Sequence, residues 1–289
     1  MRVTVPQLLD MARQGERIAM FTAYDAPTAR LVEAAGVPII LVGDTLGMVV
    51  LGYETTIPVT MDEMIHHAAA VVRGTQNALV VGDMPFMSYQ ASEEEALRNA
   101  GRFLKEAGCQ AVKLEGGRVV ASLIRKLVYY GIPVMAHVGL TPQSTNVLGG
   151  YRRQGRTAEQ AYTLLQEALA VEEAGAFSVV LELIPQQLAR VITDRLEIPT
   201  IGIGSGTDCD GQVLVFHDLL GLDPGFHPKH AKRYAEIGQA IKSAVRAYVE
   251  DVRAGAFPSD AESFAMSPQE ESRLLELQAA SEQPHPERV

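Results

Sequence analysis

Residues 39–47 read IILVGDTLG, an apolar run that leads directly to a carboxylate, Asp44. Residues 80–86, VVGDMPF, have the same form and place Asp83 after another apolar run. Runs this rich in Val, Ile and Leu are typical of parallel strands that are buried on both faces. A buried carboxylate without a partner costs several kcal/mol. Two strands that end in this way therefore indicate one partner shared by both carboxylates.

Six more segments of this kind occur along the chain, with helical segments between them. The eight expected strands begin near residues 17, 37, 78, 111, 133, 178, 199 and 213. Short Val- and Ile-rich runs that alternate with helices are the pattern of parallel strands joined by crossovers. Eight such units without an obvious reversal of order predict an α/β fold of the closed (βα)8 TIM-barrel type. The alternative is an open doubly wound sheet.

Local signals mark several helix ends and one long loop. Segments 60–63 and 92–95 fit the Ser/Thr-x-x-Glu capping box, in which side chains satisfy free amides of a first helical turn. Gly108 stands where a helix would end. Apolar spacing over residues 159–175 predicts a helix with one buried face. Residues 139–156 contain so many turn formers that we expect a sizeable loop, of the kind that often covers a site.

The chain is long enough for one such barrel, since barrels of about 250 residues commonly form a single domain. Of its 289 residues, 47% are hydrophobic and 21% are charged, which is ordinary for a folded globular protein. From about residue 258 the composition becomes polar and loses the preceding pattern. We therefore expect one catalytic barrel domain over residues 1–258 and a polar C-terminal tail over residues 259–289.

Charge and cysteine content restrict the classes of function. The net charge of −10 disfavours a nucleic-acid surface or a polybasic membrane patch, so a small-molecule substrate is expected. Cys109 and Cys209 have neither the spacing of a zinc site nor the number needed for a disulfide framework. The N-terminus has no apolar signal core, and no run approaches the roughly 18 residues of a membrane span. We expect a soluble protein of the reducing cytoplasm.

Polar residues gather at the ends of the expected strands, which is where barrel enzymes place their active sites. In chain order they are Tyr24 and Asp25, Asp44 and Thr45, Asp83, Lys113 and Glu115, His137, Glu182 and Ser205. Lys113 and Glu115 are two residues apart, so both can face the barrel axis while Leu114 faces away. Most strands thus deliver an ionisable group to one rim.

Asp44, Asp83 and Glu115 would place three carboxylates beside one ammonium group, that of Lys113. Like charges that close repel each other unless a cation neutralises them. Oxygen ligands without cysteine suit Mg²⁺, which keeps several waters and accepts a few carboxylates plus substrate oxygens. For one carboxylate alone, a helix cap or an arginine partner would be the better explanation. The set on one rim favours a Mg²⁺ site.

Glu182 lies between Val-Val-Leu and Leu-Ile-Pro, and apolar surroundings make a carboxylate a better proton acceptor. It is the best candidate for a general base. Taken alone, His137 is more often a structural histidine, but its place on the rim makes it a candidate substrate contact. GIGSG at 202–206 fits neither GxGxxG nor a P-loop, so we expect close packing there rather than a phosphate site.

The chain resembles the ketopantoate hydroxymethyltransferase family in nine motifs that occur in order between about residues 15 and 258. They are TAYD at 22, VGDTLGM at 42, PVT at 58, GDMPFMSY at 82, VKLEGG at 112, HVGLTPQS at 137, GGYRRQGR at 149, LELIP at 181 and IGIGSGTDCDGQVLVFHD at 201. Departures from the family pattern are small. Thr45 stands where serine is frequent and keeps the hydroxyl, Arg153 replaces a common apolar residue, and Ser205 replaces alanine.

The resemblance implies a barrel of the phosphoenolpyruvate/pyruvate superfamily that acts in pantothenate biosynthesis. The implied reaction moves a hydroxymethyl group from 5,10-methylenetetrahydrofolate, the co-substrate, to 3-methyl-2-oxobutanoate and gives 2-dehydropantoate. Matching motifs assign Asp44, Asp83 and Glu115 to Mg²⁺. They assign Asp44, Thr45, Asp83 and Lys113 to the keto acid, and Glu182 as the proton acceptor. The resemblance also implies a homo-oligomer, commonly a decamer.

Two other functions stay open on the residues alone. A Mg²⁺-dependent lyase of the same superfamily would cleave a C–C bond next to a keto acid. Against it, Cys109 precedes the fourth strand and Cys209 lies in a loop, so neither supplies a rim thiol. A silent barrel that serves as a scaffold or keto-acid binding protein would have lost a metal or base residue, and none is lost here.

Overall fold

The computed structural model describes residues 2–225 and 227–281 and contains a closed parallel barrel of eight strands in chain order. The strands are β1 (Ile18–Thr22), β2 (Ile39–Val42), β3 (Leu79–Asp83), β4 (Ala111–Glu115), β5 (Val134–Gly139), β6 (Ser178–Glu182), β7 (Thr200–Ile203) and β8 (Gly211–Leu214). Strand β8 pairs with β1 and closes the sheet. The expected (βα)8 barrel is confirmed, and the open sheet is excluded.

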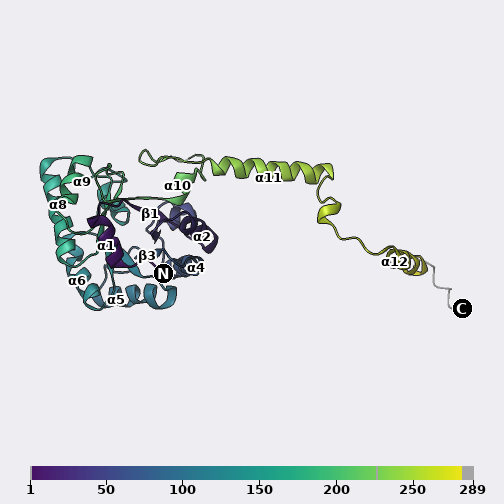
Figure 1. Cartoon of the computed structure of the whole chain (residues 1–289), viewed down its shortest axis with the longest axis horizontal. Coiled ribbons are helices and arrows are strands. Elements are labelled where there is room, and N and C mark those ends of the chain that lie inside the picture. Colours follow the sequence, from purple (N-terminus) through teal and green to yellow (C-terminus); the bar gives the residue numbers. More distant parts are fainter. Residues whose placement is uncertain (1, 226, 282–289) are drawn as a thin grey trace. The chain divides into compact units, whose positions relative to one another are not determined.

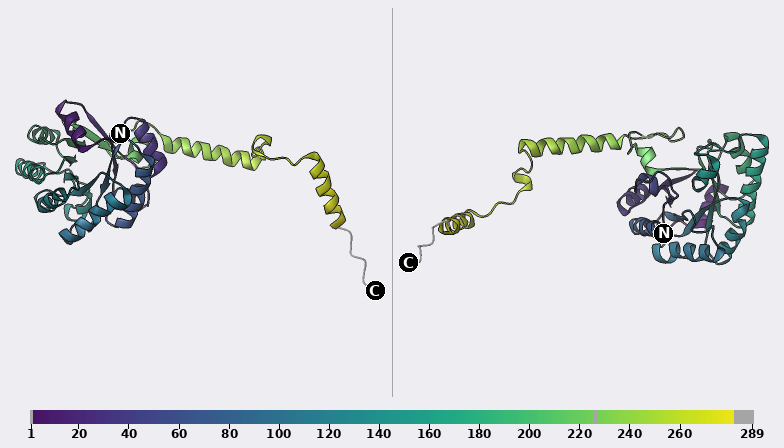
Figure 2. Two further views of the ribbon diagram at one scale, coloured as in Figure 1. Left: turned by 60° about the horizontal axis from the view of Figure 1, so that its bottom comes forward. Right: turned by 180° about the vertical axis from the view of Figure 1, so that it is seen from behind.

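Helices enclose the strands, as crossover connections require (Figure 1), and Figure 2 shows the same enclosure from two further directions. Between strands run α2 (Ala26–Ala34), α3 (Leu46–Val49), α4 (Met61–Gly74), α5 (Glu93–Arg102), η1 (Phe103–Ala107), η2 (Arg118–Val120), α6 (Ala121–Tyr129), η3 (Pro142–Ser144), α7 (Thr145–Leu148), α8 (Ala158–Glu173) and α9 (Gln186–Thr193). Helix α1 (Val5–Arg13) precedes β1, and α10 (Phe216–Leu220) follows β8.

Apolar side chains form two layers that leave one end of the barrel to polar groups. The outer layer packs helices on strands and includes Phe103 and Leu114. The inner layer fills the barrel, and Leu8 of α1 packs against it. Val3 N donates a hydrogen bond to Asn77 O just before β3, which places this segment at the amino ends of the strands. The carboxyl ends are therefore the open rim.

Most local helix signals are confirmed. Thr60 and Glu63 form the expected reciprocal capping box at the start of α4. At the start of α5, the hydroxyl of Ser92 accepts from Glu95 N at 3.2 Å. The reciprocal bond from the glutamate side chain is not found among the described residues. Gly108 ends η1 with a φ of 81°, and α8 occupies the helix expected over 159–175.

The loop after β5 and the position of β8 differ from the expectation. The expected loop over 139–156 contains the short helices η3 and α7, so its prediction as wholly irregular was wrong. The eighth strand begins at Gly211 rather than at residue 213 and ends at Leu214. Phe216 N then donates to the side-chain hydroxyl of Thr22 at 2.9 Å instead of to a backbone carbonyl of the neighbouring strand. The strand pairing therefore ends before this residue. Residues 216–220 form α10 instead of extending the strand.

A second compact unit begins at Glu236 and contains α11 (Ile237–Ala254), η4 (Asp260–Glu262) and α12 (Pro268–Ser281). Residues 250–281 are all exposed. The contacts thus divide the chain before residue 258, and the single domain over 1–258 with a tail over 259–289 stays a prediction. Residues 282–289 of that tail lie outside the described residues. Within the described ranges, no helix has the length and apolar character needed to cross a membrane.

Truncation after Ser259 is expected to leave turnover nearly unchanged. The described residues beyond this point are fully on the surface, so their removal exposes little apolar area. Steady-state turnover and the hydrodynamic size of the truncated and full-length proteins, measured side by side, check this. A large drop in turnover, or a change in assembly, would show that the segment docks on a surface and is not a tail.

Candidate active site

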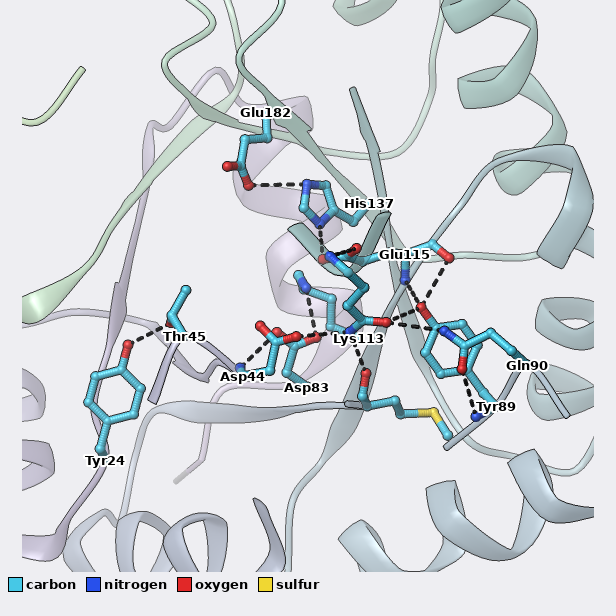
Figure 3. A network of polar contacts seen from close by, with 12 residues as sticks. Tyr24, Asp44, Thr45, Asp83, Tyr89, Gln90, Lys113, Glu115, His137 and Glu182 are labelled. Carbon is cyan, nitrogen blue, oxygen red and sulfur yellow. Dashed lines mark hydrogen bonds and ion pairs between the residues drawn. The ribbon is translucent and has the colours of Figure 1, made fainter. Parts of the chain in front are cut away.

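The rim carries a buried charged cluster made by β2, β3 and β4 (Figure 3). Lys113 Nζ lies 2.7 Å from Asp83 Oδ1, and both side chains are buried. The other oxygen of Asp83, Oδ2, accepts from Asp44 N at 3.2 Å. The strand register pairs Asp83 directly with Lys113, which explains why these residues face one another. The ends of the two apolar runs therefore meet at Asp83, which contacts both the ammonium group of Lys113 and the backbone of Asp44.

A second row of charges lies beside this cluster, with His137 between two glutamates (Figure 3). Its Nδ1 lies 3.4 Å from Glu115 Oε1, and its Nε2 lies 3.3 Å from Glu182 Oε2. The register of β4, β5 and β6 produces this row, because Glu115 pairs with His137 and Gly139 pairs with Glu182. The imidazole thus connects the expected metal ligand to the expected base.

The backbone is unusually constrained where β6 ends. Gly139 has a φ of 101°, and a Cβ there would lie 2.3 Å from Glu182 O, so only glycine permits this approach. Leu183 has a φ of 47°, a left-handed conformation that costs a non-glycine residue energy. Strain of this kind persists where the surroundings fix the chain, and here it lies directly beside Glu182.

Burial and mutual repulsion dominate the electrostatics of the cluster. Burial, and then the charges of Asp83 and Glu115, raise the pKa of Asp44 well above its usual value. Burial also raises the pKa of Asp83, although Lys113 opposes the change. Burial acts to lower the pKa of Lys113, but attraction by Asp83, Glu115 and Asp44 outweighs it and the pKa is raised. The cluster holds more negative charge than one ammonium group balances.

His137 is poised to be an imidazolium in this environment. Burial and the charge of Lys113 act to lower its pKa, whereas the contacts with Glu115 and Glu182 raise it, and the result is about 9. Neither ring nitrogen makes a hydrogen bond with the described residues, so a cationic ring attracts both carboxylates through its charge, at 3.4 Å and 3.3 Å.

The donors at the rim fit a divalent cation of the Mg²⁺ type. Glu115 Oε1 is buried and accepts no hydrogen bond from the described residues, although His137 Nδ1 lies 3.4 Å away, so this oxygen can still accept a further ligand. Among the described residues, no three His, Cys, Asp or Glu side chains form a ready-made cage. Mg²⁺ does not need one, because it binds through one or two carboxylates, waters and substrate oxygens. The arrangement therefore suits a metal ion that takes its remaining ligands from the substrate.

Of the remaining candidate residues at the rim, one lies at the site and two have structural roles. Thr45 stays at the site, where its hydroxyl is hydrogen-bonded to Tyr24 OH at 2.9 Å. Asp25 instead caps α2, since its Oδ1 accepts from Thr28 N at 2.7 Å. Ser205 donates to Leu181 O at 2.7 Å and serves the barrel wall. For these last two, the structural explanation holds.

The surroundings of Glu182 differ from the expectation, whereas those of GIGSG agree with it. Glu182 does not have purely apolar surroundings, because the folded chain brings His137 from the adjacent strand into contact with its carboxylate. The expectation of close packing at GIGSG agrees with the structure. A Cβ at Gly206 would lie 2.5 Å from the Cβ of Gln186.

Three neutral side chains near the cluster were not recognised from the sequence. Gln143 donates to Asp44 Oδ2 at 2.9 Å, and Tyr89 donates to Gln143 Oε1 at 2.8 Å. Burial, and then the charges of Asp44, Glu182 and Glu115, raise the pKa of Tyr151. All three lie inside motifs that carry the family resemblance, HVGLTPQS, GDMPFMSY and GGYRRQGR, and this was the one indication in the sequence that they belong to the site. Neutral residues in loops add nothing to a charge pattern, so their place was not apparent.

Neither thiol belongs to this chemistry. Cys109 and Cys209 are both free and buried. Burial raises the pKa of Cys109 to about 12 and that of Cys209 to about 11, so both stay protonated at neutral pH. A mechanism that needs a rim thiolate has no residue here to supply it.

The metal-free protein is expected to lose stability as the pH rises. The pKa of His137 is raised from 6.5 to about 9 on folding, so its contribution is fully present below about 6.5. That contribution disappears as the pH passes about 9. Thermal unfolding midpoints in a chelating buffer between pH 6 and 9 check this prediction. His137→Gln should flatten the profile, the exposed-site control His66→Gln should not, and a flat parental profile would contradict it.

The fold and the acidic rim first define a class of barrel. Phosphoenolpyruvate phosphomutase from Streptomyces platensis subsp. rosaceus superposes with a TM-score of 0.62 at 17% identity, over 97% of this chain and 96% of that chain. 2,3-Dimethylmalate lyase, a PEP mutase/isocitrate lyase superfamily member, superposes with a TM-score of 0.58 at 17% identity, over 97% of each chain. The likeness to both structures shows the fold, a closed parallel barrel enclosed by helices.

Sequence similarity then narrows the class to one family. The family model for ketopantoate hydroxymethyltransferase matches residues 2–260. The 3-methyl-2-oxobutanoate hydroxymethyltransferase of Carboxydothermus hydrogenoformans is 59% identical over 93% of this chain and 97% of that protein. The protein of the same name from Gluconacetobacter diazotrophicus is 57% identical over 95% of this chain and 99% of that protein. The chain belongs to the ketopantoate hydroxymethyltransferase family.

Proposed function

We propose that the protein transfers a hydroxymethyl group from 5,10-methylenetetrahydrofolate to 3-methyl-2-oxobutanoate, which yields 2-dehydropantoate for pantothenate biosynthesis. The observation that carries this proposal is the row Glu115, His137 and Glu182 beside the cluster of Asp44, Asp83 and Lys113. One rim thus combines oxygen ligands, a buried ammonium group and a base. The names of the relatives point to the same reaction.

Asp44, Asp83 and Glu115 would hold Mg²⁺, which when bound acts as a Lewis acid on the keto group of the substrate. Lys113 Nζ, held by Asp83 at 2.7 Å, offsets negative charge that develops on the keto acid. Thr45 contributes a hydroxyl whose position is set by Tyr24. These groups bind and orient the substrate before any proton moves.

Glu182 is the proposed general base that removes the proton from C3 of the keto acid. The proton passes to its carboxylate. The C3 carbon forms a bond to the methylene carbon, both C–N bonds between that carbon and the folate break, and a water molecule supplies the hydroxyl oxygen, so that tetrahydrofolate leaves. His137 Nε2 lies 3.3 Å from Glu182 Oε2, so a cationic ring orients the carboxylate by attracting this oxygen. The other oxygen stays available for the proton. In this scheme His137 is a positioning residue as well as a candidate substrate contact.

We also propose a cofactor, an oligomeric state and a cellular compartment for the enzyme. Mg²⁺ as the cofactor and a cytoplasmic homo-oligomer, commonly a decamer, follow from the family resemblance. The two free, buried thiols suit a reducing compartment. The substrates are small molecules, and we propose no nucleic-acid or membrane partner.

Formation of 2-dehydropantoate from both substrates, with and without Mg²⁺, tests the proposal. Product should appear only when the keto acid, the folate and the cation are all present. Failure to form product under these conditions would contradict the reaction. Full activity in a chelating buffer would contradict only the role of the metal.

A further inference from the structure

Gln143 is a buried neutral side chain that uses all of its hydrogen-bonding capacity beside the charged cluster. Its Nε2 donates to Asp44 Oδ2 and to Met84 O, both at 2.9 Å. Its Oε1 accepts from Tyr89 OH at 2.8 Å and from Gln90 Nε2 at 3.2 Å. Two amide hydrogens and two acceptor positions are thus satisfied. The side chain cannot rotate without losing several bonds in a buried place.

The neighbours also determine which way the amide faces. Met84 O can only accept, and the carboxylate of Asp44 accepts as well, so the NH₂ group must point to both. A flipped amide would place Oε1 against two acceptors and its hydrogens against the donors from Tyr89 and Gln90. One oxygen of Asp44 is therefore held in a fixed hydrogen bond, and its orientation follows that of Gln143.

The backbone of the same residue holds a second carboxylate. Gln143 N donates to Glu115 Oε2 at 3.1 Å. Tyr89 OH accepts from Glu115 N at 3.1 Å, while its single hydrogen goes to the closer acceptor, Gln143 Oε1. Gln143 N thus occupies Oε2 of Glu115, while Oε1 is buried without a hydrogen bond and has His137 Nδ1 at 3.4 Å. Gln143 thus links Asp44 and Glu115, which come from different strands.

A cavity adjoins the residues that form this link. A space of about 440 Å³ is lined by Tyr89, Glu115 and Gln143, among others, whereas Asp44 and Lys113 do not reach it. Tyr89 and Gln143 thus contact both this space and the buried network. Without the amide, Asp44 would lose its partner from Gln143. The repulsion among the carboxylates would then favour a movement of the Asp44 side chain.

We propose that Gln143, held by Tyr89, is a positioning residue of the metal centre. It occupies one oxygen of Asp44 and one of Glu115, so that the other oxygen of each carboxylate is presented to the cation. The inference rests on the proposed Mg²⁺ site and assigns a role to η3, in the segment that follows β5. Partners that orient metal ligands in this way typically affect metal affinity by about 10- to 100-fold.

The main test is Gln143→Met, which keeps the length and volume of the side chain but removes the amide. Calorimetry of Mg²⁺ binding in the presence of 3-methyl-2-oxobutanoate, without folate, should show a dissociation constant raised about 10- to 100-fold. Exchange of the C3 hydrogen at saturating Mg²⁺ should stay within a few fold of the parent. Gln154→Met is the matched control, because Gln154 Nε2 bonds only within its loop, to Arg152 O at 2.8 Å.

Tyr89→Phe is the second variant, and it removes the hydroxyl that donates to Gln143 Oε1 and accepts from Glu115 N. We expect a smaller loss of Mg²⁺ affinity in the same direction, so the test stands even if Gln143→Met does not fold. If the folded variants keep the Mg²⁺ affinity of the parent, the role of Gln143 is wrong, whatever their thermal stability. The proposed function would not be affected by that result. A parent that shows no Mg²⁺-dependent keto-acid binding would overturn the metal site of the proposed function, and this inference with it.

Discussion

Glu182→Gln should slow exchange of the C3 hydrogen of 3-methyl-2-oxobutanoate with deuterated water by about 10²- to 10⁴-fold, the usual value of general-base assistance. The substitution keeps the size of the side chain and a carbonyl oxygen that can face His137, but the amide cannot accept the proton. Exchange can be followed without folate, so the measurement isolates this step. Binding of the keto acid with Mg²⁺ should stay within a few fold of the parent, because the proposed ligands lie on other strands.

The matched control is Glu173→Gln, the same chemical change at an exposed residue near the end of α8. It should leave both exchange and binding at parental values. Exchange at the parental rate in Glu182→Gln would mean that another group is the base, and His137 would be the next candidate at 3.3 Å. A parallel loss of binding would instead assign Glu182 to substrate orientation.

The sequence allowed the barrel and the rim to be predicted for one physical reason. Parallel strands all end at the same edge, so residues that follow apolar runs must gather there whatever the connecting helices do. Asp44, Asp83 and Lys113 were placed together by this argument, and in the structure Asp83 accepts hydrogen bonds from both Asp44 N and Lys113 Nζ. Local periodicity and strand polarity carry that information without any knowledge of tertiary contacts.

The contacts that depend on register and on loops could not be predicted in this way. That His137 lies opposite Glu115 follows from the stagger between β4 and β5, which no local pattern encodes. Gln143 reaches Asp44 over a sequence separation of 99 residues, from a segment whose turn formers indicated only a loop. Asp25 and Asp44 look alike as carboxylates after strands, yet the first caps a helix. Only the neighbours brought in by folding separate these cases.

Asp83→Ala is expected to abolish Mg²⁺-dependent binding of the keto acid while the protein stays folded. Changes in residues that only orient ligands cost about 10- to 100-fold in affinity, and loss of a direct ligand should exceed that range. The fold should persist because Lys113 keeps Asp44 and Glu115 as nearby negative charges. The loss of stability should therefore be smaller than the roughly 3–5 kcal/mol of a fully broken buried pair. Calorimetry and thermal unfolding measure the two effects separately.

Glu93→Ala is the matched control, since Glu93 also pairs with a lysine, Lys126, at 2.9 Å, but on the surface. It should change neither binding nor the unfolding midpoint appreciably. A further comparison separates two roles of Asp83, whose oxygens contact Lys113 and Asp44 N. If Asp83 only anchors the ammonium group, Lys113→Met should weaken keto-acid binding as much as Asp83→Ala does, and Mg²⁺ should still promote binding in both. If Asp83 is also a ligand, Mg²⁺ should promote binding in Lys113→Met alone, because only that variant keeps all three carboxylates.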